Sequence, residues 1–247
     1  MGFGLTDQLF FQRTVAPVAA LPRPFLAWLI TLTMHGPHPP PPPSFRTLPL
    51  GELEGTSLGN YVLKARHTDQ ALAAFVDSLE ARGVMDDATL VIYGDHTESH
   101  RFDMAWVRRV AGVEGLPADA QHLLLDRVPL LVIPPGSREG VRIAAPGGLL
   151  DIAPTVLHVL GHPTPRWFMG RSLLAGGPGV AAQASGEAVS AELAWSGAGC
   201  YRLPDVTPVP AATCDGIRRR AREELEASWL ITRHGLGRRL AEEVPPP

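Results

Sequence analysis

The chain has 247 residues, which is long enough for one large α/β domain with a sizeable hydrophobic core. Its 45% hydrophobic and 19% charged residues are ordinary for a globular protein, and its net charge of -3 argues against a nucleic-acid partner. No apolar run approaches the roughly 20 residues of a membrane helix. The first residues, Met1 to Asp7, lack the basic start and apolar core of a signal peptide. The sequence as given therefore contains no targeting signal and predicts no route of its own out of the cytoplasm.

The first elements form a predicted helix and a predicted strand. Residues 6–20 have a helical pattern of apolar positions, which prolines 22 and 24 end. Residues 25–33 are an almost unbroken apolar run of strand length. Five prolines from Pro39 onward then form a stiff polyproline segment that cannot enter a sheet or helix. His35 is therefore expected at a strand end, where a rigid loop holds the chain that leaves it.

A long amphipathic helix is predicted next. Apolar residues recur at three- and four-residue spacing at Tyr61, Ala65, Thr68, Leu72, Phe75, Val76 and Leu79, with Lys64 and charged neighbours on the opposite face. Gly83 is placed to end this helix. The uncharged run 89–93 follows and has the composition of a buried strand. Together they predict an αβ unit of the doubly wound type.

Asp95 and His96 follow that strand directly, after Gly94 breaks the run. In open α/β sheets, ligands bind just beyond the carboxyl ends of strands. An Asp oxygen and a His nitrogen together make a plausible half of a divalent-metal site. The alternative is that Asp95 caps a turn and His96 is a loop residue, and the triplet alone favours that alternative. His100, four residues after His96, does not complete the His-Glu-x-x-His pattern of zinc proteases.

Later elements are a strand at 128–133, a helix at 151–161 with Asp151 as its N-cap rather than a ligand, and a charged helix at 215–234. Residues 176–199 are Gly/Ala/Ser-rich and indicate only a weakly apolar connection. Cys200 and Cys214 could close a loop of about 15 residues, worth about 3 kcal/mol, or they could be two unrelated thiols. A disulfide would imply an oxidising compartment, which conflicts with the missing signal peptide and hints that the chain is incomplete.

The order of motifs resembles a known family. Phe25 to His35 is followed by Thr68-Asp-Gln-Ala-Leu72, Val91-Ile-Tyr-Gly-Asp-His96, Arg127-Val-Pro-Leu130, Asp151-Ile-Ala-Pro-Thr155 and Phe168-Met-Gly-Arg-Ser-Leu173. This succession resembles the C-terminal half of the sulfatase-like catalytic domain of lipoteichoic acid synthases and related phosphoglycerol transferases, in the alkaline phosphatase superfamily. The resemblance covers roughly residues 3–175. It implies an α/β sandwich with a central, mostly parallel sheet that is truncated at its N-terminus. Residues 1–175 would form this C-terminal part of the sulfatase-like catalytic domain. Residues 176–247 would form a Gly/Ala-rich connection and a helical tail.

The resemblance assigns roles to three residues. It makes Asp95 and His96 metal ligands, with Mn²⁺ favoured and Mg²⁺, Zn²⁺ or Ca²⁺ as alternatives. It places His35 in the substrate pocket, whereas the residue pattern alone favours a strand-end residue bonded to its own loop. A divalent ion would neutralise a phosphoryl oxygen and activate a hydroxyl nucleophile. The implied reaction transfers glycerol phosphate from a phospholipid to a glycan or glycolipid acceptor. The alternatives are a phosphate- or sulfate-ester hydrolase of the same superfamily, or a non-catalytic remnant that acts as a binding or structural module.

The chain also departs from that family. Its members carry a nucleophilic Thr and a further acidic metal ligand well before the strand that corresponds to 25–33, and only 24 residues precede it here. No catalytic residue is therefore assigned, and the chain is expected to be a fragment that is inactive alone. Neither Cys200 nor Cys214 begins the Cys-x-Pro-x-Arg signature of formylglycine sulfatases. Intact members are membrane-anchored, with the catalytic domain on the extracytoplasmic face of the membrane or in the periplasm.

Overall fold

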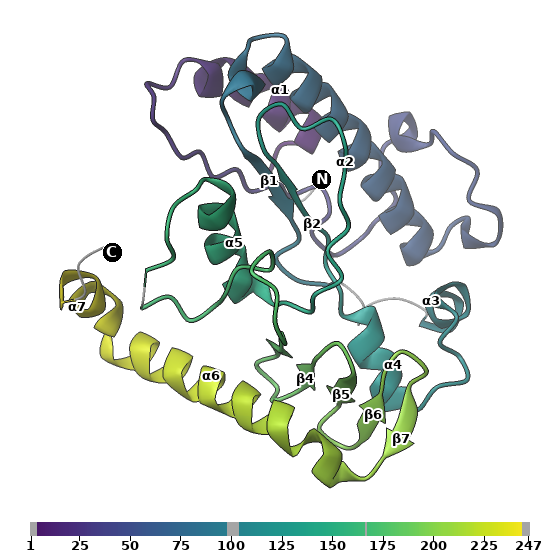
Figure 1. Cartoon of the computed structure of the whole chain (residues 1–247). Coiled ribbons are helices and arrows are strands. Elements are labelled where there is room, and N and C mark those ends of the chain that lie inside the picture. The colour runs from purple at the N-terminus through teal and green to yellow at the C-terminus, as the bar shows by residue number, and fades with distance from the viewer. Residues whose placement is uncertain (1–3, 98–103, 166, 244–247) are drawn as a thin grey trace. The chain divides into compact units, whose positions relative to one another are not determined.

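The computed structural model describes residues 4–97, 104–165 and 167–243 (Figure 1). The chain divides into two compact units, one built mainly from residues up to Leu90 and the other mainly from Val91 onward. Both helices and sheets are present, as an α/β protein requires.

Two helices form the centre of the first unit. Helix α1 (Asp7–Ala19) begins where the Thr6 hydroxyl accepts a hydrogen bond from the Leu9 amide, and helix α2 (Ser57–Glu80) begins with the same type of cap at Thr56. Gly83 takes the left-handed conformation just after α2, with φ of 68°, which a residue without a side chain adopts at little cost. Three short 3₁₀ turns complete the unit: η1 (Pro43–Phe45), η2 (Gly51–Leu53) and η3 (Val84–Asp86). Both predicted helices are confirmed.

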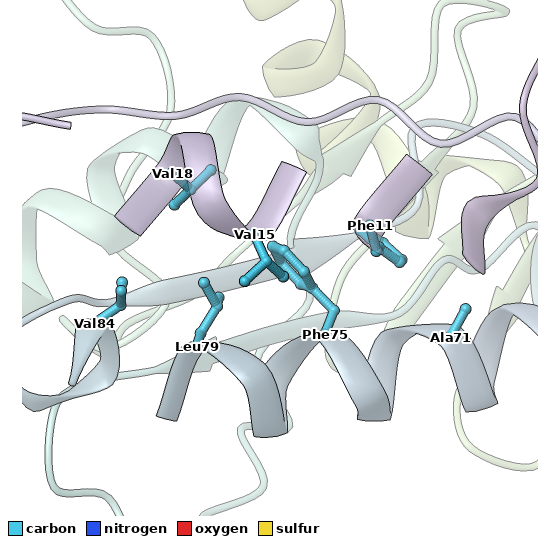
Figure 2. Packing of buried hydrophobic residues seen from close by; sticks show 7 residues of the cluster. All are labelled: Phe11, Val15, Val18, Ala71, Phe75, Leu79 and Val84. Atoms are coloured by element: carbon cyan, nitrogen blue, oxygen red, sulfur yellow. The ribbon is translucent and has the colours of Figure 1, made fainter. Parts of the chain in front are cut away.

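Apolar side chains from α1 and α2 form the core of this unit. Figure 2 shows the buried residues Phe11, Val15, Val18, Ala71, Phe75, Leu79 and Val84. The rings of Phe11 and Phe75 stack with their centroids 4.6 Å apart, so one large contact joins the two helices. Burying each large side chain of this kind stabilises the fold by about 1.5–3 kcal/mol. The helices are therefore held together by packing.

Residues 25–33 do not form the predicted strand in a sheet. The segment belongs to no helix or strand in the described structure, although its side chains alternate as a strand's do. Phe25, Ala27 and Leu29 pack against the α1–α2 core, and the residues between them are exposed. The segment has a strand's alternation but pairs with no strand among the described residues, and the amides at its end, Leu32 and Thr33, donate to the Asp7 carboxylate. The sequence pattern was right and the expected pairing was not observed.

The second unit begins with a pair of strands. Strand β1 (Leu90–Tyr93) pairs with β2 (Leu130–Ile133), and helices α3 (Met104–Ala111) and α4 (Ala118–Leu125) lie between them in sequence. The Gly94 amide donates to the Pro129 carbonyl at 3.1 Å, which places the end of β1 beside the start of β2. Both strands fall within their predicted ranges, and Pro129 lies just before β2 rather than inside it.

Asp151 lies at the start of helix α5 (Ile152–Val159), after the 3₁₀ turn η5 (Leu149–Asp151). Its position at the N-cap was predicted, but its side chain makes no capping bond to α5. Instead, one carboxylate oxygen accepts from the Arg171 amide at 2.8 Å and the other accepts from the Gly148 amide at 3.0 Å. The buried carboxylate therefore joins two loops, because a buried charge must be satisfied by hydrogen bonds.

The C-terminal part holds a sheet that the sequence did not predict. Five antiparallel strands follow in chain order: β3 (Ala181–Ala182), β4 (Ala188–Val189), β5 (Leu193–Trp195), β6 (Cys200–Arg202) and β7 (Thr207–Val209). The 3₁₀ turn η6 (Ala211–Cys214), α6 (Asp215–His234) and α7 (Leu236–Glu243) complete the unit (Figure 1). Residues 176–199 are thus more than a connection. Strands of two or three residues are too short to give a periodic sequence signal.

A disulfide joins Cys200 on β6 to Cys214 in η6, with Cα atoms 5.8 Å apart. Of the two possibilities that the sequence left open for these cysteines, the structure shows the disulfide, and the separation lies within the usual range. Among the described residues, no helix combines the length and the apolar composition that a membrane crossing requires.

Candidate functional site

The structure places Asp95 and His96 in the loop that begins where β1 ends. Gly94 makes this exit possible, because a Cβ atom at that position would lie 2.9 Å from the Cβ of Val128. A side chain there would push β1 away from the residues before β2. The glycine therefore lets the chain leave the strand in close contact with its neighbour and carry the acid and the imidazole outward.

Asp95 and His96 face each other in a way that favours a cation. The His96 Nδ1 lies 3.0 Å from the Thr97 carbonyl oxygen, and a carbonyl can only accept, so Nδ1 carries the proton. The other ring nitrogen, Nε2, lies 3.9 Å from an Asp95 carboxylate oxygen. In the neutral ring Nε2 presents a lone pair, and two electron-rich atoms at this distance repel. A cation held by both atoms would offset this repulsion.

Both side chains are accessible to a ligand: Asp95 is 79% exposed and His96 is 65% exposed. Carboxylate oxygen and imidazole nitrogen are donors that Mn²⁺ and Zn²⁺ accept, so the chemistry of the pair fits such an ion. No group of three His, Cys, Asp or Glu side chains that could hold a metal was found among the residues that the structure describes. The pair could therefore supply two donors to a metal centre. Glu98 and His100 lie outside the described residues.

Asp126, a residue that the sequence analysis did not single out, anchors this loop. The Thr97 hydroxyl donates a short hydrogen bond to an Asp126 carboxylate oxygen, 29 positions along the chain. Together with the bond from Gly94 to Pro129, it holds the loop on both sides of Asp95 and His96. A single sequence gives no signal for a hydrogen bond between residues so far apart. The loop is therefore positioned by contacts on both flanks of the candidate ligands.

His35 belongs to the first unit and is exposed. Its amide donates to the Leu32 carbonyl at 3.1 Å, and its Nδ1 lies 2.6 Å from the Gly36 carbonyl oxygen. These bonds fit the expectation from residue pattern alone, a strand-end residue bonded to its own loop, and they leave the ring accessible. The place of His35 in the substrate pocket, which the resemblance implies, stays a prediction.

Asp7 fixes the backbone that leads to His35. One oxygen of its fully buried carboxylate accepts from the amides of Leu32 and Thr33, at 3.1 and 3.0 Å. The other oxygen accepts from the Thr68 hydroxyl of α2 at 2.8 Å. The Asp7 amide in turn donates to the Thr33 hydroxyl at 2.8 Å. One side chain thus joins α1, α2 and the end of the 25–33 segment, two residues before His35.

Lys64 supports the loop after His35 and corrects a prediction. Its helical position predicted a solvent-facing charge, but the residue is only 5% exposed. Its Nζ lies 3.3 Å from the Pro37 carbonyl oxygen and 3.5 Å from Nδ1 of the buried His38. Asn60 donates to the His38 carbonyl at 3.0 Å. The start of the proline-rich loop packs onto α2, and this packing buries the charge and supplies its partners.

The sulfatase family profile matches residues 4–162. Lipoteichoic acid synthase 2 of Bacillus subtilis is 32% identical over 173 residues, which cover 69% of this chain and 26% of that protein. Lipoteichoic acid synthase 1 of the same bacterium is 34% identical over 68% of this chain and 26% of its own length. The chain therefore spans about a quarter of the length of these curated relatives.

Two solved structures share the fold. The lipoteichoic acid synthase LtaP from Listeria monocytogenes matches with a TM-score of 0.79 at 22% identity, over 94% of this chain and 60% of that one. An alkaline phosphatase superfamily protein from Vibrio parahaemolyticus matches with a TM-score of 0.60 at 17% identity, over 93% and 56% of the respective chains. The predicted α/β fold is confirmed. With its profile match over most of the chain, this protein belongs to the sulfatase family and has lipoteichoic acid synthases as homologues.

Proposed function

We propose that this chain is part of a metal-dependent phosphoglycerol transferase domain, which moves glycerol phosphate from a phospholipid to a glycan or glycolipid acceptor. The observation that carries the proposal is the Asp95–His96 pair, two exposed donors on an anchored loop at the end of β1. The names of the lipoteichoic acid synthase relatives support the substrate class. The whole protein's donor and acceptor remain part of the proposal, because the chain spans only a quarter of those relatives.

Asp95 and His96 would hold the divalent ion, with Mn²⁺ favoured over Mg²⁺, Zn²⁺ and Ca²⁺. When bound, such an ion supplies Lewis-acid chemistry, neutralising charge on a phosphoryl oxygen and activating a hydroxyl nucleophile. The bond from His96 Nδ1 to the Thr97 carbonyl sets the tautomer in which Nε2 can bind a metal. His35 would hold the phosphoglycerol group, because an imidazole can donate to a phosphate oxygen or transfer a proton.

We assign the nucleophilic Thr and the further acidic metal ligand to the part of the catalytic domain that this chain does not span. A catalytic metal site keeps about three protein ligands and one open position. Asp95 and His96 supply two, so this chain alone should bind metal weakly and turn over no substrate. The Cys200–Cys214 disulfide supports an oxidising compartment, in agreement with catalysis on the outer face of the membrane or in the periplasm.

Calorimetric titration of the purified 247-residue chain with Mn²⁺ tests the metal role. We expect weak binding that Asp95→Asn and His96→Gln each weaken by about tenfold or more. The matched controls are Asp77→Asn on α2 and His158→Gln on α5, which make the same changes at exposed positions elsewhere. If all four variants bound Mn²⁺ with the affinity of the unchanged chain, Asp95 and His96 would not be ligands of the metal. Turnover of a fluorescent phosphatidylglycerol analogue by this chain alone would contradict its proposed dependence on the rest of the domain.

A further inference from the structure

Helix α6 has a packed side and an open side. Ile217 and Ala221, near its start, pack in the buried core beside the C-terminal sheet. Figure 1 shows α6 running along this sheet and continuing toward α7. Trp229 and Leu230, about two turns beyond Ala221, are 55% and 46% exposed. The second half of α6 therefore carries two adjacent large apolar side chains on its open side.

Arginine and tryptophan line this open side. Along the helix, four residues follow one another at spacings of four, seven and four positions, which places them on one side of a helix with 3.6 residues per turn: Arg218, Arg222, Trp229 and Arg233. The Arg218 guanidinium lies 4.1 Å from the centroid of the Trp195 ring of β5, and the Arg233 guanidinium lies 4.6 Å from that of the Trp229 ring. A guanidinium stacked on a ring keeps N–H groups at its edge, where they can bind an anion.

Two of these arginines keep an uncompensated charge. Salt bridges compensate other arginines of α6 and α7, in the pairs Arg218–Asp215, Arg220–Glu224 and Arg238–Glu242. In the part of the chain that the structure describes, Arg222 and Arg233 form no such pair. Glu226 lies on the same side as Arg222, but no acidic residue occurs between positions 227 and 241. Positive charge is thus concentrated toward the end of the row, on a chain whose net charge is -3.

A small cavity opens beside the start of the row. It has a volume of about 190 Å³ and is lined by Gly186, Trp195, Arg218, Arg222, Leu225 and Glu226. This volume is below the roughly 300–1,000 Å³ of a pocket for a drug-sized molecule, so the cavity fits a compact group. Arg222 can donate paired hydrogen bonds to a phosphate, and Glu226 can accept one from a hydroxyl group next to that phosphate. The cavity therefore fits a phospholipid headgroup that carries hydroxyl groups.

The apolar residues distinguish between the possible anionic partners. A soluble phosphodiester polymer would use the arginines and leave Trp229 and Leu230 in water. A bilayer surface uses both, because a Trp ring lies at the level of the headgroups and an arginine beside it extends its charge to the phosphates. A second copy of this chain is a poor cover, since two side chains present far less than the roughly 800 Å² that each partner of a stable interface buries.

We propose that the open side of α6 lies on an anionic phospholipid surface. Trp229 and Leu230 lie at the level of the headgroups, Arg222 and Arg233 bind lipid phosphates, and the cavity beside Arg222 takes one headgroup. This contact rests on the proposed function in one respect, that the substrate is a phospholipid held in such a surface. Binding to vesicles needs neither metal nor turnover, so failure of the proposed metal role would leave the contact intact.

Co-sedimentation of the purified 247-residue chain with vesicles tests this contact. We expect binding to equal parts of phosphatidylglycerol and phosphatidylcholine, little binding to phosphatidylcholine alone, and loss of binding as salt is raised. Arg233→Gln should weaken binding to the mixed vesicles about fivefold, and Trp229→Ser about tenfold or more. The matched controls Arg13→Gln on α1 and Trp28→Ser, at other exposed positions, should leave it unchanged. Equal binding to both kinds of vesicle, or equal losses in the controls, would overturn the proposal.

Quenching by brominated phosphatidylglycerol tests which residue meets the lipid. We expect quenching of tryptophan fluorescence in the unchanged chain and in Trp28→Phe, and its loss in Trp229→Phe. Trp229→Phe should still bind the vesicles, so loss of the signal is separated from loss of the fold. Quenching that persists in Trp229→Phe would place another tryptophan at the surface and overturn the proposal. So would tight binding of a soluble glycerol phosphate polymer that Arg233→Gln abolishes and Trp229→Ser retains, because the row would then be a polymer site.

Discussion

The helical core of the first unit and the C-terminal sheet of the second are stabilised in different ways. The first depends on large apolar side chains that cross between α1 and α2 (Figure 2). The second is built from strands of two or three residues, and its fully buried side chains include Cys214 and Ala188. It is closed by the Cys200–Cys214 disulfide and by hydrogen bonds to Asp119. Strands this short bury little apolar area, so a covalent link and buried polar bonds take a larger share of the stability.

This difference predicts which perturbation each region responds to. The first unit should be sensitive to loss of side-chain volume and insensitive to redox conditions. The C-terminal sheet should be sensitive to reduction and to pH. Urea unfolding with pulsed hydrogen exchange and mass spectrometry measures the stability of each region, because peptides from each unit then report their own unfolding. A single unfolding midpoint for the whole chain is not assumed.

The largest effect is expected from Phe75→Ala. Phe75 is 4% exposed and stacks on Phe11, so its truncation leaves a cavity at the centre of the first core. We expect a loss of about 3–5 kcal/mol in peptides from α1 and α2, with no change in peptides from the C-terminal sheet. Val76→Ala, at the half-buried neighbouring position of the same helix, is the control and should cost less. Equal effects of the two variants would show that the core is not centred on Phe75.

Reduction of the disulfide should come next and act on the other region. The two cysteines are 14 positions apart, so opening the bond restores the chain entropy of a loop of about 15 residues, worth about 3 kcal/mol. The double variant Cys200→Ser/Cys214→Ser should lower the midpoint for peptides at 188–214 and leave α1 and α2 unchanged. Dithiothreitol should reproduce this result in the native chain and have no effect on the variant. Equal destabilisation of both regions would contradict the comparison.

A smaller effect is expected from Asp7→Ala, which tests how polar bonds contribute to the packed unit. The substitution removes the acceptor of three hydrogen bonds and leaves the amides of Leu32 and Thr33 without it. A lost buried acceptor typically costs about 1–3 kcal/mol. Exchange at residues 32–35 should accelerate more than exchange in α2. Asp69→Ala, which removes an exposed carboxylate of α2, is the control and should have little effect.

The sequence predicted those parts of the fold whose stability is local and periodic. Helix α6 matches its predicted range of 215–234, and β1 lies within 89–93. The sheet at 181–209 was missed because its strands have only two or three residues each, too few for a periodic signal, although each strand pairs with its neighbour in the chain. Residues 25–33 show the opposite case, since the strand pattern is strong and the pairing is not among the described residues. The hydrophobic pattern thus predicted which secondary structure a segment could adopt, and tertiary contacts determined which one it adopted.

The candidate site was predictable where its residues are adjacent in sequence. Asp95 and His96 follow a recognisable strand, so their position could be inferred from the sequence alone. Asp126, Asp7 and Lys64 could not be found in this way, because the partners described above lie 25 or more positions away. Lys64 was predicted to be exposed to solvent and is buried instead. The proline-rich loop that covers it has no periodic signal from which this contact could be predicted. The residues that hold a site are therefore harder to predict than those that carry its chemistry.

Asp119 joins α4 to the C-terminal sheet and should give it a pH dependence. The Tyr201 hydroxyl donates to an Asp119 oxygen at 2.7 Å, and the Ser196 hydroxyl donates to the same oxygen. The Ser196 bond is the main cause that lowers the pKa of Asp119 below its ordinary 3.8, aided by the Tyr201 bond and opposed by burial. Burial, and then the bond to Asp119, raise the pKa of Tyr201 above its ordinary 10.0.

The smallest predicted effect is a loss of sheet stability at both ends of the pH range. Because the folded pKa of Asp119 is lowered, the unfolded chain binds more protons below pH 3.8, and the contribution of Asp119 is lost as pH falls through its folded pKa. Because the folded pKa of Tyr201 is raised, the unfolded chain loses its proton first, and stability is also lost as pH rises above 10.0. Urea midpoints for peptides at 188–214 should therefore fall at pH 3 and at pH 10.5 relative to pH 7. Asp119→Asn should remove the acid limb of this difference, and Tyr201→Phe the alkaline limb, whereas Asp205→Asn should change neither. An acid limb that persists unchanged in Asp119→Asn would mean that other carboxylates of the sheet, rather than this hydrogen-bonded one, set its acid sensitivity.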